Sequence, residues 1–313
     1  MKYDQSLWTL FQNSNLSRRQ FIQACCALAG MLGLPPAMLP AVVAGAEIKP
    51  LIPVIWLHGQ ECTGCSAAFM AAYEPSFASV ILNAVRLEYH SLLAAAAGVA
   101  LDQNREQIMR EFGGKYLLVT EGAVPGGAGD SFCSVGGVPY VEMLQRAAQQ
   151  AAAVVAVGSC AAWGGIQAAQ PNPTRAVATQ QVLAGKPVVN IPGCPPIPEV
   201  IAAVVFQYSL FGQLPARDSK GRPARFYART VHATCPRKPF FTAGQFAEQH
   251  DDRGAQAGWC LYKLGCRGPA TFNACTAVGW WQGLASPVRA GSPCIGCSTA
   301  AFWDDGSFSG QDV

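Results

Sequence analysis

The chain reads VIWLHGQECTGC from Val54 to Cys65, a stretch that joins an apolar run to a pair of cysteines. The run at residues 54–57 is short, rich in β-branched and aromatic side chains, and not interrupted by polar residues. These properties predict a strand of a parallel sheet that is covered on both faces. Cys62 and Cys65 then follow the carboxyl end of this strand, which is the edge where open α/β sheets bind ligands.

Further runs of the same kind follow, and helical patterns alternate with them. The runs lie at residues 116–120, 154–157 and 188–191. The helical patterns lie at residues 66–73, 92–112, 138–152, 174–183 and 199–210. This alternation predicts an open α/β sheet, and we expect the domain that contains it to occupy residues 47–220.

Two of the later runs also lead into a cysteine. Cys160 follows Gly158-Ser159, and Cys194 follows Pro192-Gly193. Four thiolates from three loops would meet at one sheet edge, and the neighbouring glycines let the backbone come close to a bound group. Four thiolates suit a 4Fe–4S cluster. A redox dithiol, a zinc site and inert buried thiols are the alternatives, although structural zinc sites usually draw their ligands from two short knuckles.

The last third of the chain has a different composition. Residues 221–313 are rich in Gly, Pro, Cys and aromatic side chains and contain few periodic runs, so we expect a loop-rich domain that depends on metal. Seven further candidate ligands lie within it: His232, Cys235, Cys260, Cys266, Cys275, Cys294 and Cys297. The first four combine one imidazole with three thiolates, and a neutral imidazole tends to raise a cluster's reduction potential. The last three suggest a 3Fe–4S cluster, or a 4Fe–4S cluster with a ligand from elsewhere.

The N-terminus has the pattern of an export signal. Ser17-Arg18-Arg19-Gln20-Phe21 is a twin-arginine motif, residues 24–34 are apolar, and Ala44-Gly45-Ala46 offers a small-x-small cleavage site. The apolar stretch is much shorter than the roughly 20 residues of a membrane-spanning helix, which argues against a membrane anchor. We therefore expect a removable signal at residues 1–46 and a periplasmic protein.

Removing this signal takes Cys25 and Cys26 out of the count and leaves eleven of the thirteen cysteines. Cys133 is the one mature cysteine outside the three groups, and we interpret it as a structural or incidental thiol. No later stretch is long and apolar enough to span a membrane, so we expect membrane association only through a partner.

The overall composition limits the class of protein. Half of the residues are hydrophobic and only 13% are charged, which suits a large core or a surface covered by a partner. The net charge of +3 and the lack of a basic run give no support for nucleic-acid binding.

Taken together, the motifs resemble those of the small subunit of nickel–iron hydrogenases. The matching segments are Glu61-Cys62-Thr63-Gly64-Cys65, Gly158-Ser159-Cys160, Gly193-Cys194-Pro195-Pro196, His232-x-x-Cys235-Pro236, Gly258-Trp259-Cys260-Leu261, Gly265-Cys266-Arg267-Gly268-Pro269 and Pro293-Cys294-Ile295-Gly296-Cys297-Ser298. They extend over nearly the whole mature chain, and their order is far more specific than any single CxxC.

The resemblance implies a flavodoxin-like domain followed by an iron–sulfur domain, with the nickel–iron centre in a separate large subunit. It assigns a proximal 4Fe–4S cluster to Cys62, Cys65, Cys160 and Cys194. It assigns a medial cluster to Cys275, Cys294 and Cys297, and a distal 4Fe–4S cluster to His232, Cys235, Cys260 and Cys266. Electrons from H2 would pass along these clusters to a cytochrome or another acceptor.

Several positions refine what the resemblance implies. Pro287 stands where some relatives have a fourth medial cysteine, which favours 3Fe–4S. Gly64 and Gly165 stand where oxygen-tolerant relatives have extra cysteines, which favours an ordinary proximal cluster and an oxygen-sensitive enzyme. Glu61 is either a proton-path carboxylate or a carboxylate that caps its loop.

Two other functions remain as alternatives at this stage. The first domain also occurs in a subunit of a proton-pumping quinone oxidoreductase, which lacks the segment from His232 to Cys297. The second alternative is a secreted structural protein stabilised by zinc or by disulfides.

Overall fold

A parallel five-stranded sheet forms the centre of the molecule. The computed structural model describes residues 17–48, 51–73, 76–127, 132–183, 185–281 and 283–304. The strands are β1 (Ile52–His58), β2 (Val85–His90), β3 (Leu117–Glu121), β6 (Ala153–Val157) and β7 (Val188–Ile191), in the order β2-β1-β3-β6-β7. All neighbouring pairs are parallel. This is the flavodoxin-like order, so the predicted fold class is confirmed.

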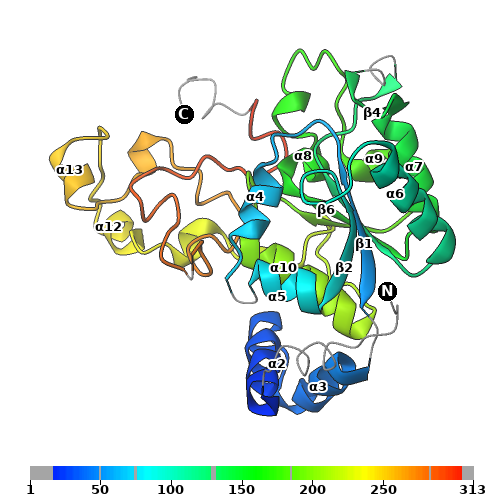
Figure 1. Ribbon diagram of the computed structural model, residues 1–313. Coiled ribbons are helices and arrows are strands. Elements are labelled where there is room, and N and C mark those ends of the chain that lie inside the picture. Colours follow the sequence, from blue (N-terminus) through cyan, green and yellow to red (C-terminus); the bar gives the residue numbers. More distant parts are fainter. Residues whose placement is uncertain are drawn as a thin grey trace.

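Helices cover both faces of the sheet, because successive side chains of each strand point to opposite faces. On one face, Trp56 and its neighbours pack under α4 (Gly64–Met70), α5 (Phe77–Asn83) and α10 (Pro198–Phe211). On the other face, Ile55 and its neighbours pack under α6 (Val99–Glu111) and α7 (Tyr140–Gln150) (Figure 1). The central strands β1, β3 and β6 are therefore buried on both sides, as their largely apolar sequences require.

The structure corrects the predicted elements in several places. The sequence pattern missed β2, because the strand mixes Arg86 and Glu88 with apolar residues at the sheet edge. The helix predicted over residues 92–112 begins only at Val99, and Leu92 and Leu93 lie exposed in the preceding turn.

Two other predicted helices are shorter than expected. The pattern over residues 138–152 contains β5 (Val138–Pro139), which pairs with β4 (Ser134–Val135) before α7 begins. The pattern over residues 174–183 contains only the four-residue helix α9 (Thr179–Val182).

The C-terminal segment consists of short helices and turns beside the carboxyl edge of the sheet (Figure 1). Its helical turns are α11 (Ala224–Tyr227), η4 (Val231–Thr234), α12 (Lys238–Thr242), α13 (Arg253–Gln256) and η5 (Tyr262–Leu264). It is joined to the first domain at α8 (Gly158–Trp163), where Ser159 Oγ donates to the carbonyl of Cys297 and Trp163 Nε1 donates to that of Ser298 at 3.2 Å.

The N-terminal segment forms two helices that pack against α10. They are α2 (Arg18–Leu32) and α3 (Leu39–Ile48), joined by the short turn η1 (Pro36–Met38). Residues 1–16 of the predicted signal lie outside the described residues. Within the part of the chain that the structure describes, no helix combines the length and the apolar character needed to cross a bilayer.

Candidate functional site

The carboxyl ends of β1, β6 and β7 bring the first four predicted ligands together. Cys65 is the most buried of them. The pKa of its thiol is raised well above the ordinary value by burial, by the charge of Glu121 and by the charges of Cys160, Cys194 and Cys62. Such mutual charge effects require sulfur atoms that lie close to one another. The structure therefore places these four cysteines in one group, as the sequence predicted.

Glycines make room for this group of sulfurs. A Cβ atom at Gly158 would collide with Cys65 Sγ, and one at Gly165 would collide with Cys160 Sγ. Both glycines have positive φ angles of 90° and 63°, which also disfavour other residues. Gly64 is less constrained, with its hypothetical Cβ 3.2 Å from Cys62 Sγ. Gly64 and Gly165 thus both adjoin sulfur atoms of this group.

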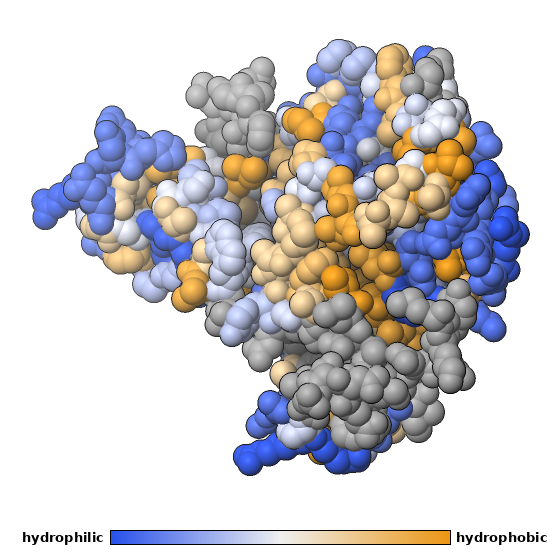
Figure 2. Space-filling model, in the orientation of Figure 1, coloured by the Kyte–Doolittle hydropathy of each residue, from blue (hydrophilic) through white to orange (hydrophobic). Residues whose placement is uncertain are grey.

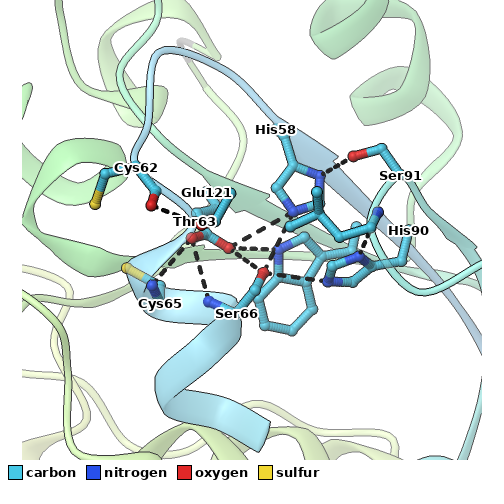
Figure 3. Close-up of polar contacts among 10 residues, drawn as sticks. His58, Cys62, Thr63, Cys65, Ser66, His90, Ser91 and Glu121 are labelled. Carbon is cyan, nitrogen blue, oxygen red and sulfur yellow. Dashed lines mark hydrogen bonds and ion pairs between the residues drawn. The ribbon is translucent and has the colours of Figure 1, made fainter.

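A buried carboxylate, which the sequence pattern did not reveal, holds the loop of Cys62 and Cys65 (Figure 3). Glu121 ends β3 and is only 1% exposed. Its Oε1 accepts the backbone amides of Cys65 (3.0 Å) and Ser66 (3.2 Å). Its Oε2 accepts the Ser66 hydroxyl (2.5 Å) and Trp56 Nε1 (3.1 Å). Four donors thus fix the first turn of α4 against β1 and β3, at the switch point of the sheet.

Two histidines extend this network toward the surface. Ser66 Oγ lies 3.3 Å from His58 Nε2 and 3.2 Å from His90 Nε2, and His58 Nδ1 lies 3.0 Å from Ser91 Oγ (Figure 3). Burial and the neighbouring His58 lower the pKa of His90 to about 3. Burial lowers the pKa of His58, and the charge of Glu121 opposes this effect.

The sequence contains two signals that could have indicated this network. His58 and Ser66 lie on either side of the CxxC motif, and Glu121 is an acidic residue at the end of a mainly apolar strand.

Glu61 and Cys133 lie near each other on this side of the sheet. Burial and Glu121 raise the pKa of Glu61 to about 7, and Glu61 Oε2 is buried without a hydrogen-bond partner in the described structure. Burial and the charge of Glu61 raise the pKa of the Cys133 thiol. Cys133 therefore lies near Glu61, the residue that precedes the first ligand of the first cysteine group.

The group of His232, Cys235, Cys260 and Cys266 lines a pocket in the C-terminal segment. The pocket encloses about 310 Å³ of space free of protein atoms, part of it open to solvent. The amide of Arg237 lies 3.4 Å from Cys235 Sγ, and the Arg237 guanidinium donates to the carbonyls of Val288 and Trp259. Burial and the charge of Lys238 lower the pKa of His232, which keeps its imidazole neutral and able to bind metal.

The remaining three cysteines lie between the other two groups. Burial and the charges of Cys297 and Cys294 raise the pKa of Cys275 well above its ordinary value. Burial and the charges of Cys294 and Cys194 raise the pKa of Cys297 to about 12. On the other side, the amide of Cys294 lies 3.3 Å from Cys266 Sγ. The three groups are therefore linked in the order proximal, medial, distal.

The chemistry of these groups fits iron–sulfur clusters. All thirteen cysteines are described, and each carries a free thiol. Among the described residues, no three His, Cys, Asp or Glu side chains converge as closely as a single metal ion requires. A cluster of several irons binds each thiolate at a separate iron, so its ligands need not converge on one point. Backbone amides lie 3.4 Å from Cys235 Sγ and 3.3 Å from Cys266 Sγ, and amides of this kind are the donors that cluster ligands usually receive.

Known families match both halves of the chain. A family model described as "NADH ubiquinone oxidoreductase, 20 Kd subunit" matches residues 62–208. A second model, which describes the C-terminal part of the "NiFe/NiFeSe hydrogenase small subunit", matches residues 227–309. The first match covers the domain that the hydrogenase small subunit shares with the quinone oxidoreductase subunit. The second match covers the C-terminal segment, which the quinone oxidoreductase subunit lacks.

Individual relatives agree with the second match. The uptake hydrogenase small subunit of Azotobacter vinelandii is 46% identical over 304 residues, which cover 97% of this chain and 85% of that protein. The hydrogenase-1 small chain of Escherichia coli (strain K12) is 42% identical over 313 residues, which cover 100% of this chain and 84% of that protein.

Solved structures show the same likeness. The reduced, active Ni-Fe-Se hydrogenase of Desulfomicrobium baculatum aligns with a TM-score of 0.75 and 32% identity, covering 80% of this chain and 96% of that one. The oxidised [NiFeSe] hydrogenase of Desulfovibrio vulgaris Hildenborough aligns with a TM-score of 0.75 and 36% identity, covering 82% and 96%. The chain therefore belongs to the family of nickel–iron hydrogenase small subunits, and the enzyme it serves is the heterodimer with a large subunit.

Proposed function

We propose that this chain carries electrons from H2 oxidation in the large subunit through three iron–sulfur clusters to an external acceptor. The observation that supports this path most strongly is the linkage of the three cysteine groups. The charge of Cys194 in the first group acts on the thiol of Cys297 in the second, and the hydroxyl of Ser159, next to Cys160, donates to the carbonyl of Cys297. Cys294 of the second group donates its amide to Cys266 of the third. Adjacent ligands of successive clusters give short steps for electron transfer.

The proposed ligands follow the three groups in the structure. Two 4Fe–4S clusters are held by Cys62, Cys65, Cys160 and Cys194, and by His232, Cys235, Cys260 and Cys266. One 3Fe–4S cluster is held by Cys275, Cys294 and Cys297. When bound, each cluster supplies a reversible one-electron centre whose potential depends on its ligands, hydrogen bonds and exposure.

The protein's own part in this function is to hold the thiolates and to set their surroundings. The Glu121 network fixes the amides of Cys65 and Ser66, so that the first ligand loop keeps its shape. The Arg237 guanidinium donates to the carbonyls of Val288 and Trp259, and so it connects two segments beside the pocket of His232, Cys235, Cys260 and Cys266. The neutral His232 replaces a thiolate there, which favours a higher potential at the end of the path.

We propose that the carboxyl edge of the sheet packs against the large subunit. Cys62 and Cys194 are exposed there, and the segments that follow the strands carry exposed large apolar side chains: Met70, Leu92, Leu93 and Ile166. Figure 2 shows apolar residues gathered around α4, while the region of α13 is hydrophilic. An exposed apolar area of this kind marks a protein interface.

The medial ligands can be tested by replacing Cys275 with serine. The Cys275→Ser complex is expected to lose the 3Fe–4S electron paramagnetic resonance (EPR) signal of the oxidised state, because Cys275 supplies one of only three thiolates. The signals of the two 4Fe–4S clusters should remain. If the 3Fe–4S signal persists at full intensity in Cys275→Ser, the medial ligand set is wrong.

Glu61 is proposed as a proton-path carboxylate at the large-subunit interface. Its Oε2 has no hydrogen-bond partner among the described residues, and burial and Glu121 raise its pKa to about 7, so it can take up and release a proton near neutral pH. Replacing Glu61 with glutamine should lower H2-dependent dye reduction by about 100-fold, since proton transfer by a placed side chain contributes roughly 10²–10⁴-fold. The EPR signals of all clusters should be unchanged. A fully active Glu61→Gln enzyme would leave only the loop-capping role.

We further propose export to the periplasm through the twin-arginine signal at residues 1–46. This route carries folded proteins, so clusters can be inserted before export. The electron acceptor is proposed to be a cytochrome or a similar carrier, through which the enzyme associates with the membrane.

Pulse labelling should show a precursor that becomes shorter on export, and replacing Arg18 and Arg19 with lysine should retain it in the cytoplasm.

A further inference from the structure

The described part of the proposed leader, from Ser17 onward, is folded, and its twin-arginine motif forms the start of a helix. Ser17 is the N-cap of α2: its hydroxyl accepts the amide of Gln20, and Gln20 Oε1 accepts the amide of Ser17 at 2.8 Å. This capping box fixes the first turn of the helix. Arg18 Nη2 lies 2.9 Å from Oε1 of Glu47, near the end of α3. The ion pair joins the two ends of a helical hairpin.

The hairpin buries one apolar side against the folded domain. Phe21, Cys25 and Ala29 follow one another at intervals of four residues and are 0%, 3% and 6% exposed. Residues at this spacing share one face of a helix. Val42 and Ala46 of α3 are buried as well, and all five belong to the same apolar core as α10. Figure 1 shows the hairpin on the side of α10 that faces away from the sheet.

The sequence of α10 explains why it needs this cover. Only Glu199, Gln207 and Ser209 are polar among its fourteen residues, so the helix is apolar around its whole circumference. A helix of this kind is usually buried rather than exposed along one side. The sheet and α4 cover one side, and α2 and α3 contact another.

The contact with α10 is close and specific. A Cβ atom at Gly45 would lie 3.0 Å from the backbone oxygen of Leu210, so α3 approaches α10 where it has no side chain. Arg225 Nη2 donates to the carbonyl of Gly30 at 3.0 Å, near the C-terminal end of α2. A cation is favourable at this end of a helix.

The predicted cleavage site lies within this contact. Ala44, Gly45 and Ala46 are in α3, and Ala46 is only 2% exposed. Proteases cut preferentially at exposed, flexible segments. We propose that the outer face of α10 is a docking site for the chain's own leader, and that the docked leader withholds its cleavage site until the hairpin is released. The proposal rests on the export function proposed above.

Thiol labelling of the full-length precursor tests the docking directly. Cys25 is buried and Cys26 is exposed, so one leader offers a probe and its control. The leader peptide is labelled with a maleimide, and mass spectrometry follows the rate of labelling. The Cys26→Ser variant keeps only Cys25 in the leader, and the Cys25→Ser variant keeps only Cys26. Cys25 should react at least about tenfold more slowly than Cys26, because it reacts only after local opening. Equal rates would overturn the proposal.

A matched pair of glycine substitutions tests the effect on cleavage. Gly45→Leu pushes against Leu210, whereas a Cβ atom at Gly30 would meet no atom within 4 Å. Both changes add the same apolar side chain and the same helix propensity to the leader. Gly45→Leu should bring the labelling of Cys25 close to that of Cys26 and should speed removal of the leader, whereas Gly30→Leu should change neither. The proposal is wrong if the two variants behave alike.

The outcomes also separate docking from export. If Cys25 is protected but the precursor is never exported or shortened, the docking stands and the export proposal fails. If the leader is exported and removed while Cys25 labels as fast as Cys26, the export proposal stands and the docking fails.

Discussion

Replacing Cys65 with serine is expected to remove the proximal cluster and to reduce H2-dependent dye reduction by the complex to background. Cys65 is the most buried thiol of its group and is surrounded by the sulfurs of the other three. Serine is a poor ligand for iron, and the first step of the electron path would be lost. Iron analysis should show about four iron atoms fewer per chain, and the 3Fe–4S signal should persist as a sign that the second domain is intact.

Cys133→Ser is the matched control for this variant. Cys133 is also partly buried and lies near Glu61, but it belongs to none of the three groups. Its replacement should change neither the iron content nor the activity. An active Cys65→Ser complex with full iron content would contradict the proximal assignment, and a loss of iron in Cys133→Ser would show that the ligand set is incomplete.

Replacing Glu121 with glutamine is expected to loosen the loop that carries Cys62 and Cys65. The carboxylate accepts four hydrogen bonds in a buried site, and a glutamine amide group can accept from only part of these donors. Leaving one or two buried donors unsatisfied costs about 1–3 kcal/mol each. We therefore expect the amides of Cys65 and Ser66 to exchange hydrogen roughly 100-fold faster, measured on the peptide that contains α4.

The same substitution on the surface gives the control. Glu248 pairs with Lys263 in an exposed ion pair, and such pairs contribute about 0–1 kcal/mol. Glu248→Gln should leave exchange at Cys65 and Ser66 unchanged. Unchanged exchange in Glu121→Gln as well would mean that the buried network does not hold the ligand loop.

The sequence predicted the parallel sheet because its central strands are unbroken apolar runs. It also predicted the first cysteine group, because cysteines that follow the strands of a parallel sheet meet at one edge. The prediction failed where tertiary position decides the structure. The edge strand β2 has a mixed sequence, and residues 92–98 have a helical composition but lie in an exposed turn after β2.

The buried network was missed for a similar reason. Glu121 is separated from Cys65 by 56 residues, and only the pairing of β1 with β3 brings them together. A single sequence shows an acid at the end of a strand but not the four donors that surround it. The linkage of Cys194 to Cys297 likewise depends on how the second domain packs on α8.

The most direct test of the three-cluster path is iron and acid-labile sulfide analysis combined with an EPR redox titration of the purified complex. About eleven iron atoms per small subunit are predicted, with a 3Fe–4S signal in the oxidised state and two 4Fe–4S signals that appear on reduction with H2. A colourless chain that contains zinc and no acid-labile sulfide would contradict the electron path.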